Sequence, residues 1–148
     1  MDSDDYISAN AIELLADAAV QKRPDFVIGN YEVTGARRWA PPLSLGTGFY
    51  EGNALVLSTY VQGKWYVMAW NKLVSRPLVL QHKLYFQEGI VHEDDLWSFK
   101  LACMSQSMYV VNETTYYYSM QPDSIMRAPS MRNLECRVPV SYTHLRAH

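Results

Sequence analysis

Apolar positions near the start of the chain follow a helical period. Between residues 10 and 20 they recur every three or four positions, which predicts an amphipathic helix. Asn10 and Glu13 have the spacing of a capping box, so we expect the helix to begin there. Residues 25–31, which follow Pro24 and contain the apolar run Phe-Val-Ile, predict a short buried strand.

Helical and strand patterns continue to alternate along the chain. Helices are expected over residues 51–60 and 93–104, and Pro77 should open a short helix because proline suits the first helical turn. Segments 108–111 and 114–118 are rich in β-branched and aromatic residues and predict two strands. This alternation favours an α/β fold, or α+β if the sheet is antiparallel.

The composition is that of one folded domain. The 148 residues are 49% hydrophobic, which is enough for a core. A net charge of -2 gives no general attraction for nucleic acid. Two cysteines make no disulfide framework, and we find neither a signal peptide nor an apolar run long enough to span a membrane. We therefore expect a soluble, cytoplasmic protein.

The end of the chain has neither helical nor strand periodicity. We predict an irregular tail over residues 131–148. From about residue 140 it looks like translated adaptor sequence rather than native protein, so its histidines receive no functional weight.

The first of two acidic clusters, Asp2, Asp4 and Asp5, lies at the start of the chain. Carboxylates two apart in an extended segment can converge on one hard cation, such as magnesium or manganese, whose other ligands are phosphate and water. The alternative is an acidic approach to the following helix, and spacing alone favours it. A calcium-binding EF-hand is excluded because Ile7 stands where that loop needs glycine.

The second acidic cluster, residues 92–95, has the sequence His-Glu-Asp-Asp at the start of the predicted helix. Amides at a helix N-terminus stabilise an ionised carboxylate, whereas adjacent like charges increase its affinity for a proton. A carboxylate under both influences could accept a proton from a hydroxyl. The alternative, ordinary charge at a helix start, is the more common explanation of an isolated triplet.

Aromatic residues form a third feature. The four tryptophans and the run of tyrosines at 116–118 could stack on sugar rings, although core positions explain most of them. Alternation along a strand predicts that Tyr117 faces away from its two neighbours. Basic residues are not interleaved with these aromatics, so we set nucleic-acid binding aside.

Five segments stand in a recognisable order. They are Asp-Ser-Asp-Asp-Tyr-Ile-Ser at 2–8, Trp-Asn-Lys-Leu at 70–73, Gly-Ile-Val-His-Glu-Asp-Asp-Leu-Trp at 89–97, Tyr-Tyr-Tyr at 116–118 and Ser-Ile-Met at 124–126. Over about residues 1–130 this order resembles the family 2 glycosyltransferases of bacterial surface-polysaccharide synthesis, which have the GT-A fold.

The resemblance implies transfer of a sugar, with inversion, from a nucleotide-sugar to an acceptor hydroxyl. The donor is usually a UDP-sugar, and the acceptor is a glycan or a lipid-linked glycan. By the same resemblance Asp4 binds a divalent metal, magnesium or manganese, and Asp2 helps to hold the metal or the ribose. Such a metal offsets the negative charge that grows on the leaving diphosphate.

The resemblance also implies an acceptor side. Asp94 is the base that deprotonates the acceptor, and Glu93 orients the acceptor or shares this task. The acceptor-binding candidates are His92, Trp70, Asn71 and Lys72. For the last three a structural role is at least as strong an alternative, and the resemblance gives His92 no defined role.

The chain departs from the family in two places. Ser119 follows the tyrosine run where many relatives have arginine. The family's nucleotide-binding half would lie before Asp2. We therefore expect residues 1–130 to be the acceptor-side part of a GT-A domain, with a mixed sheet flanked by helices and without the N-terminal βαβ units. Such a part should be inactive alone.

Other readings remain open. A non-catalytic carbohydrate-binding or interaction module would use the tryptophans for stacking without chemistry. A carboxylate-dependent hydrolase would activate water and release free sugar, and one fold can host many reactions. The family resemblance also allows peripheral attachment at the inner face of the cell membrane, although this chain supplies no transmembrane segment.

Overall fold

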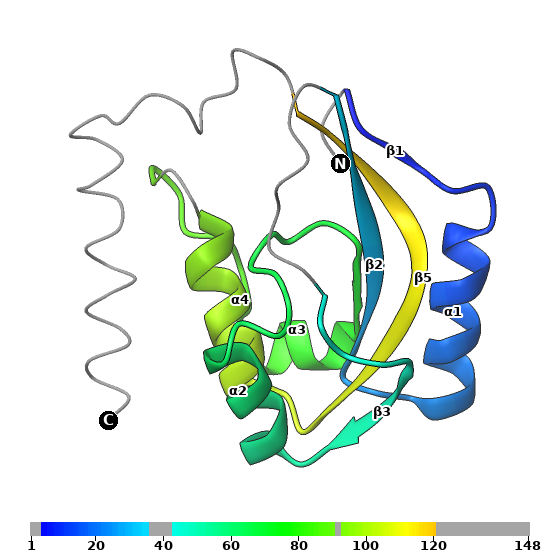
Figure 1. Ribbon diagram of the computed structural model, residues 1–148. Helices are drawn as coiled ribbons and strands as arrows, with labels where there is room; N and C mark the ends of the chain where they lie inside the picture. Colours follow the sequence, from blue (N-terminus) through cyan, green and yellow to red (C-terminus); the bar gives the residue numbers. More distant parts are fainter. Residues whose placement is uncertain (1–3, 36–42, 91–92, 121–148) are drawn as a thin grey trace.

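The computed structural model describes residues 4–35, 43–90 and 93–120 (Figure 1). The elements are β1 (Tyr6–Ile7), α1 (Ala11–Lys22), β2 (Phe26–Gly35), β3 (Gly48–Glu51), α2 (Asn53–Val61), β4 (Lys72–Val74), α3 (Arg76–His82), α4 (Glu93–Met104) and β5 (Ser107–Met120). Predictions that concern Asp2, His92, segment 124–126 and the tail 131–148 lie outside the described residues.

A mixed sheet forms the centre of the fold, which confirms the predicted α/β class. Its main path has the order β1-β5-β2-β4, and β3 also pairs with β5. The long strands β2 and β5 are parallel, whereas β1, β3 and β4 pair antiparallel with their neighbours. Helix α1 covers one face of this sheet, and α2, α3 and α4 lie on the other side (Figure 1).

The hydrophobic core lies on both faces of β2. Phe26 and Ile28 are fully buried in the larger cluster, together with Trp65 on the side of α2–α4. Val27, which points the opposite way, packs with Leu15 of α1. Because burial of one such side chain contributes roughly 1.5–3 kcal/mol, this strand anchors both layers.

The predicted helices are confirmed, with small shifts of their ends. The helix expected at 93–104 is α4, and those expected at 10–20 and 51–60 are α1 and α2. Pro77 lies in the first turn of α3, where the side chain of Ser75 accepts a hydrogen bond from the amide of Leu78.

The capping box predicted for α1 is wrong. The side chain of Asn10 makes no capping hydrogen bond to the helix. Its Oδ1 instead accepts a hydrogen bond from the Ser8 hydroxyl, 3.0 Å away. The helix start is therefore held by the preceding turn, in which the Ala11 amide donates to the Ser8 carbonyl.

The two strands predicted at 108–111 and 114–118 are one continuous strand, β5. Its parallel partner β2 follows it along its length, and register shifts around Asn30 absorb the interruption. At the same level the Asn30 side chain donates to Oδ1 of Asn112, 2.9 Å away. Pairing with a partner distant in sequence thus overrides the polar break between the two segments.

Candidate functional site

The opening acidic segment is fastened to the carboxyl end of β5 by Asp5. This buried carboxylate accepts hydrogen bonds from the Tyr116 hydroxyl at 2.5 Å and from the Ser119 amide at 2.8 Å. Directly after it, Tyr6 and Ile7 pair with β5. Asp4, one residue earlier, is exposed. The anchor therefore leaves the carboxylate proposed as a metal ligand facing solvent.

Sequence reasoning missed the role of Asp5. The two-residue spacing of Asp2 and Asp4 suggests a metal site and gives Asp5 no separate role. The available signal was position: Asp5 directly precedes the aromatic and β-branched pair Tyr6 and Ile7, which is typical of a strand. A carboxylate at that place can reach the neighbouring strand, although the sequence does not say which strand it is.

The parallel pair β2 and β5 gives the sheet a common carboxyl edge. Both strands run in the same direction and their last paired residues are Gly35 and Met120. The start of β1 lies beside these strand ends (Figure 1). Open α/β sheets bind ligands outside the carboxyl ends of their parallel strands, so Asp4 lies at the edge where a ligand is expected.

Trp70 is the centre of an aromatic cluster on this part of the sheet. Its ring stacks on Tyr116, with ring centroids 4.3 Å apart and planes 3° apart. Tyr66 stacks on it at 5.1 Å, Tyr31 meets it edge to face at 4.9 Å, and the Tyr118 ring lies tilted against it at 5.5 Å. Trp70 is half-buried, and these aromatic neighbours pack it against the hydrophobic core.

The other tryptophans in the described ranges are also core residues. Trp65 is buried, and its Nε1 donates to the Thr59 hydroxyl at 3.1 Å. Trp97 is buried, and its Nε1 donates to the Leu84 carbonyl at 3.1 Å. The core interpretation of these residues is confirmed.

The predicted alternation along the tyrosine run is confirmed. Tyr116 and Tyr118 contact Trp70 on one side of the sheet. Tyr117 instead stacks on Tyr6, with ring centroids 4.6 Å apart. The two faces of this strand end therefore present separate aromatic surfaces.

Asn71 clamps an irregular part of β2. Its Nδ2 donates to the Asn30 carbonyl at 2.9 Å, and its Oδ1 accepts from the Thr115 hydroxyl at 2.8 Å. Its backbone is left-handed, with φ of 58°. Gly29 donates its amide to the Asn71 carbonyl, so the clamp joins three segments of the sheet.

Lys72 lies against the turn that precedes it. Its Nζ atom donates to the carbonyls of Tyr66, at 3.1 Å, and Met68, and it lies 4.3 Å from the centre of the Tyr66 ring. Burial holds the pKa of Lys72 well below its ordinary value, while the negative charge of Asp94 opposes this shift. The charge of the candidate base Asp94 therefore acts on the Lys72 amine.

Asp94 lies in the first turn of α4, where the sequence placed it, and is half-buried. Burial raises the pKa of its carboxyl above the ordinary value, and the charges of Asp95 and Glu93 raise it further. Backbone hydrogen bonds from its own amide and from Ala69 oppose the rise. Glu93, by contrast, is exposed.

The segment between α2 and β4 connects the two acidic regions. Its Val67 carbonyl accepts a hydrogen bond from Ser98 of α4, and its Ala69 backbone bonds to the Asp94 carboxylate. The next residue, Trp70, stacks on Tyr116, whose hydroxyl holds Asp5. The contacts thus join the Asp5 region to the Asp94 region through one loop.

The divalent metal predicted at the opening aspartates would be held by few protein ligands. Within residues 4–35, 43–90 and 93–120, no three His, Cys, Asp or Glu side chains gather as a metal site. Exposed Asp4 nevertheless fits an open site, because magnesium or manganese held by one or two carboxylates takes its other ligands from phosphate and water.

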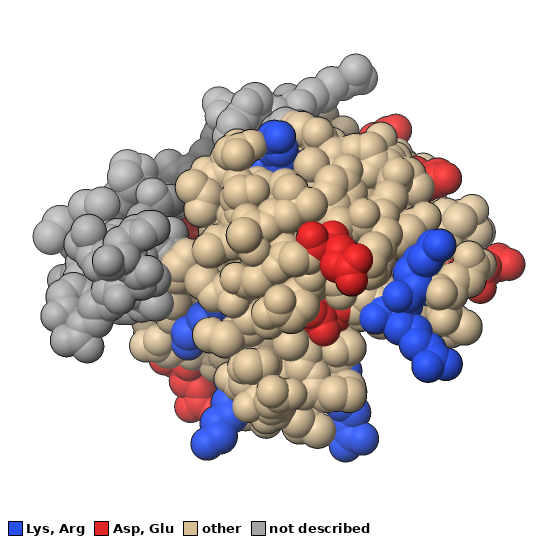
Figure 2. Space-filling model, turned by 90° about the horizontal axis from the view of Figure 1, so that it is seen from below, with Lys and Arg blue, Asp and Glu red and all other residues tan. Residues whose placement is uncertain are grey.

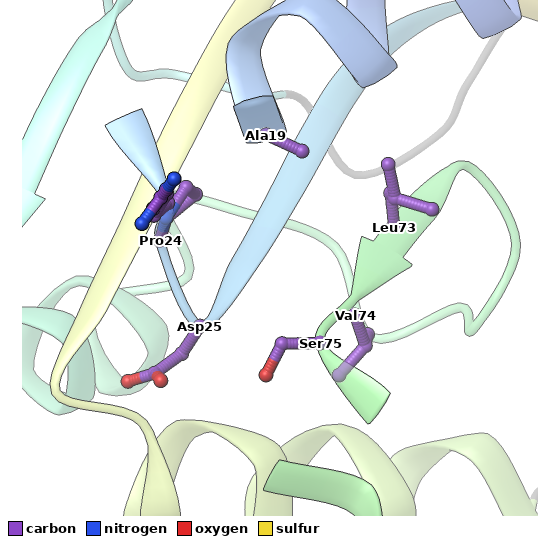
Figure 3. Close-up of a pocket in the computed structure, with 7 residues that line it drawn as sticks. Ala19, Pro24, Asp25, Leu73, Val74 and Ser75 are labelled. Atoms are coloured by element: carbon purple, nitrogen blue, oxygen red, sulfur yellow. The ribbon is translucent and has the colours of Figure 1, made fainter. Parts of the chain in front are cut away.

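A pocket of about 270 Å³ lies at the other end of the sheet, near the start of β2 (Figure 3). It is lined by residues including Pro24, Leu73 and Ser75. Asp25 also lines it, but its carboxylate accepts hydrogen bonds from the amides of Gln106 and Ser107. The acidic group is therefore used to hold the α4–β5 turn.

The face seen from below carries side chains of both charge signs (Figure 2). Acidic and basic groups occupy separate small areas there, and neither sign forms a continuous field over the coloured surface. This face therefore has no basic surface of the kind that binds nucleic acid. In the part of the chain that the structure describes, no helix has the length and apolar character needed to cross a membrane.

Comparisons with known proteins point to glycosyltransferases. The chain is 24% identical to Glycosyltransferase GlyG of Streptococcus pneumoniae serotype 4 over 147 positions, covering 86% of this chain and 44% of that protein. No protein-family model matches. This sequence similarity relates the chain to GlyG, and the chain spans less than half of the length of that protein.

Solved structures share the fold. The structure of S. aureus TarS 1-349 in complex with UDP-GlcNAc matches with a TM-score of 0.74 and 17% identity, over 98% of this chain and 41% of that one. The structure of S. aureus TarS matches with a TM-score of 0.67 and 19% identity, over 83% of this chain and 21% of that one. The likeness confirms the mixed α/β fold.

Proposed function

We propose that these residues form the acceptor-side part of an inverting family 2 glycosyltransferase of surface-polysaccharide synthesis. The donor would be a nucleotide diphosphate sugar, most simply a UDP-sugar, because the TarS structure of similar fold is a complex with UDP-GlcNAc. The acceptor would be a hydroxyl of a glycan or lipid-linked glycan. The relationship to GlyG supports the general reaction class.

The placement of Asp94 is the observation that carries the proposal. Its carboxyl is half-buried at the start of α4, beside the loop that reaches the sheet, and its pKa is raised. A base works best when its pKa approaches the working pH, so the shift favours proton transfer from an acceptor hydroxyl. The exposed Glu93 would orient the acceptor.

The proposed step is one displacement. The acceptor oxygen attacks the anomeric carbon and its proton passes to Asp94. The bond from that carbon to the diphosphate oxygen breaks, and its electron pair leaves on the diphosphate. Attack from the face opposite to the leaving group inverts the anomeric centre.

Asp4, with Asp2, would hold a magnesium or manganese ion against the donor diphosphate. The bound ion would offset the charge of the leaving group. The exposed position of Asp4 beside the anchored Asp5 supports this assignment. His92, Trp70, Asn71 and Lys72 remain acceptor-side candidates. Because Trp70 and Asn71 pack against and hydrogen-bond to neighbouring residues, they would act on the acceptor by shaping the site.

The test is turnover of UDP-GlcNAc with manganese, measured for these 148 residues and for the reading frame that contains them. Asp94→Asn should reduce turnover by about two to four orders of magnitude and leave UDP binding nearly unchanged. Asp17→Asn, on an exposed position of α1, is the matched control.

Two outcomes would point elsewhere. A carbohydrate-binding module would bind glycans without turnover even in the reading frame that contains these residues, and its binding would be insensitive to Asp94→Asn. A hydrolase would release free sugar at the same rate with and without an acceptor. Either result would contradict the transferase proposal.

A further inference from the structure

Tyr116 contacts both halves of the proposed site. Its side chain is buried, with 2% of its surface exposed, and its hydroxyl donates to Asp5 at 2.5 Å. Its ring lies flat on Trp70 at 4.3 Å. Asp5 follows the candidate metal ligand Asp4, and Trp70 follows Ala69, whose backbone bonds to Asp94.

Two different interactions of one side chain make this contact. The hydroxyl interaction is a hydrogen bond to a carboxylate, which is shorter and stronger than one between neutral groups. The ring interaction is a stacked aromatic pair, which contributes beyond the area it buries. A buried side chain held at both ends has little freedom to move. A displacement of the segment that contains Asp5 should therefore also displace the loop that contains Trp70.

We infer that Tyr116 is a positioning residue that holds the donor-side carboxylates and the acceptor-side base in a fixed relation. This inference rests on the proposed glycosyltransferase function. In this role Tyr116 acts through its neighbours and not on the reacting atoms. It sets where Asp4 stands through Asp5, and where Asp94 stands through Trp70 and the loop between α2 and β4.

The two interactions can be separated by substitution. Tyr116→Phe keeps the ring and its stack on Trp70 but removes the hydrogen bond to Asp5. Tyr117→Phe is the matched control, because it removes a tyrosine hydroxyl from the adjacent residue on the opposite face of the same strand. Trp70→Leu keeps the hydroxyl contact and removes the stack.

The first measurement, made on the reading frame that contains these residues, is manganese binding in the presence of UDP, followed by the electron paramagnetic resonance signal of free manganese. Tyr116→Phe should weaken manganese binding about tenfold, in line with loss of a hydrogen bond to a charged group, and Tyr117→Phe should leave it unchanged. In turnover, excess manganese should restore kcat to Tyr116→Phe. A merely structural role would lower the melting temperature and kcat without moving the manganese midpoint.

The second measurement is amide hydrogen exchange without metal or nucleotide. Tyr116→Phe should accelerate exchange at the Ser8 amide, which donates to the Thr115 carbonyl, and Trp70→Leu should also accelerate it although it touches neither Asp4 nor Asp5. Exchange at Ser8 equal to that of Tyr117→Phe would overturn the inference. If the wild type binds no manganese with UDP, the donor-side proposal fails and hydrogen exchange alone decides the role of Tyr116.

Discussion

Gly29 and Thr115 lie so close that a Cβ atom on Gly29 would come within 2.1 Å of the Thr115 hydroxyl oxygen. The same Cβ atom would lie 2.9 Å from the side-chain Nδ2 of Asn71. Thr115 is fully buried, so its side chain has little space to move away. The absence of a side chain at Gly29 therefore allows β2, β5 and the Asn71 clamp to meet.

Gly29→Ala should reduce the free energy of unfolding by about 1–3 kcal/mol, because an added methyl group in a packed core forces neighbours to shift. Denaturant unfolding followed by circular dichroism measures this. Gly46→Ala is the matched control, since a Cβ there meets nothing within 4 Å. An equal loss in both variants would show that the close approach carries no cost.

Asn71 allows a test of backbone strain against side-chain bonding. Asn71→Gly and Asn71→Ala both lose the bonds to Asn30 and Thr115, but alanine must also adopt the left-handed backbone with φ of 58°. The alanine variant should be less stable than the glycine variant by about 1 kcal/mol. Thermal unfolding of the two variants side by side gives the difference, and an alanine variant equal to or above the glycine variant would contradict the assignment.

Local signals explain which elements were predictable. Helix α4 matches its expected bounds because its acidic first turn and its freedom from glycine and proline are written in consecutive residues. The single strand β5 was not predictable, because its continuity comes from pairing with β2 some eighty residues away in sequence. Asn10 has the right spacing for a cap, but its side chain instead accepts a hydrogen bond from Ser8 in the preceding turn.

The site divides in the same way. The 93–95 triplet could be found from its position at a helix start, and segment 70–72 from the resemblance. The contact between Asp5 and Tyr116 joins residues 111 positions apart, so no local pattern contains it. The burial that raises the pKa of Asp94 likewise comes from packing around α4, which the sequence does not display.

Buried tyrosines should make the protein sensitive to alkali. Burial raises the pKa values of Tyr31, Tyr60 and Tyr66 well above the ordinary value. In the unfolded chain these groups lose their protons near pH 10, so the unfolded state binds fewer protons there and stability falls as the pH rises. The buried amine of Lys72 acts in the opposite direction only below about pH 10.4, where it is still charged in the unfolded chain.

The measurement is the free energy of unfolding at several values above about pH 10.4, together with tyrosinate absorbance. Tyr60→Phe should reduce the steepness of the decline because one of the three raised groups is removed. Tyr85→Phe, at an exposed side chain, is the control. A decline of equal steepness in wild type and Tyr60→Phe would contradict the prediction.

The ionised form of Asp94 should support activity but lower the stability of the folded protein. The pKa of Asp94 is raised in the folded state, so folding favours its protonated form. The contribution of this proton to the free energy of unfolding is lost as the pH rises through the folded pKa. Asp94→Asn mimics the protonated form, so at pH 7 it should raise the melting temperature while turnover falls. Below the ordinary carboxyl pKa of about 3.9, where Asp94 is protonated in both states, the gain in stability should disappear.

Calorimetry of wild type and Asp94→Asn at pH 7 and at about pH 3.5 tests this sign, with Asp17→Asn as the control for loss of a carboxylate at an exposed position. In an active preparation the rate should also fall as the pH drops through the raised pKa, since only the ionised carboxylate accepts the acceptor's proton. An Asp94→Asn protein that is less stable than wild type at pH 7 would mean that the charged carboxylate is stabilised by its surroundings, and its assignment as a base with raised proton affinity would then fail.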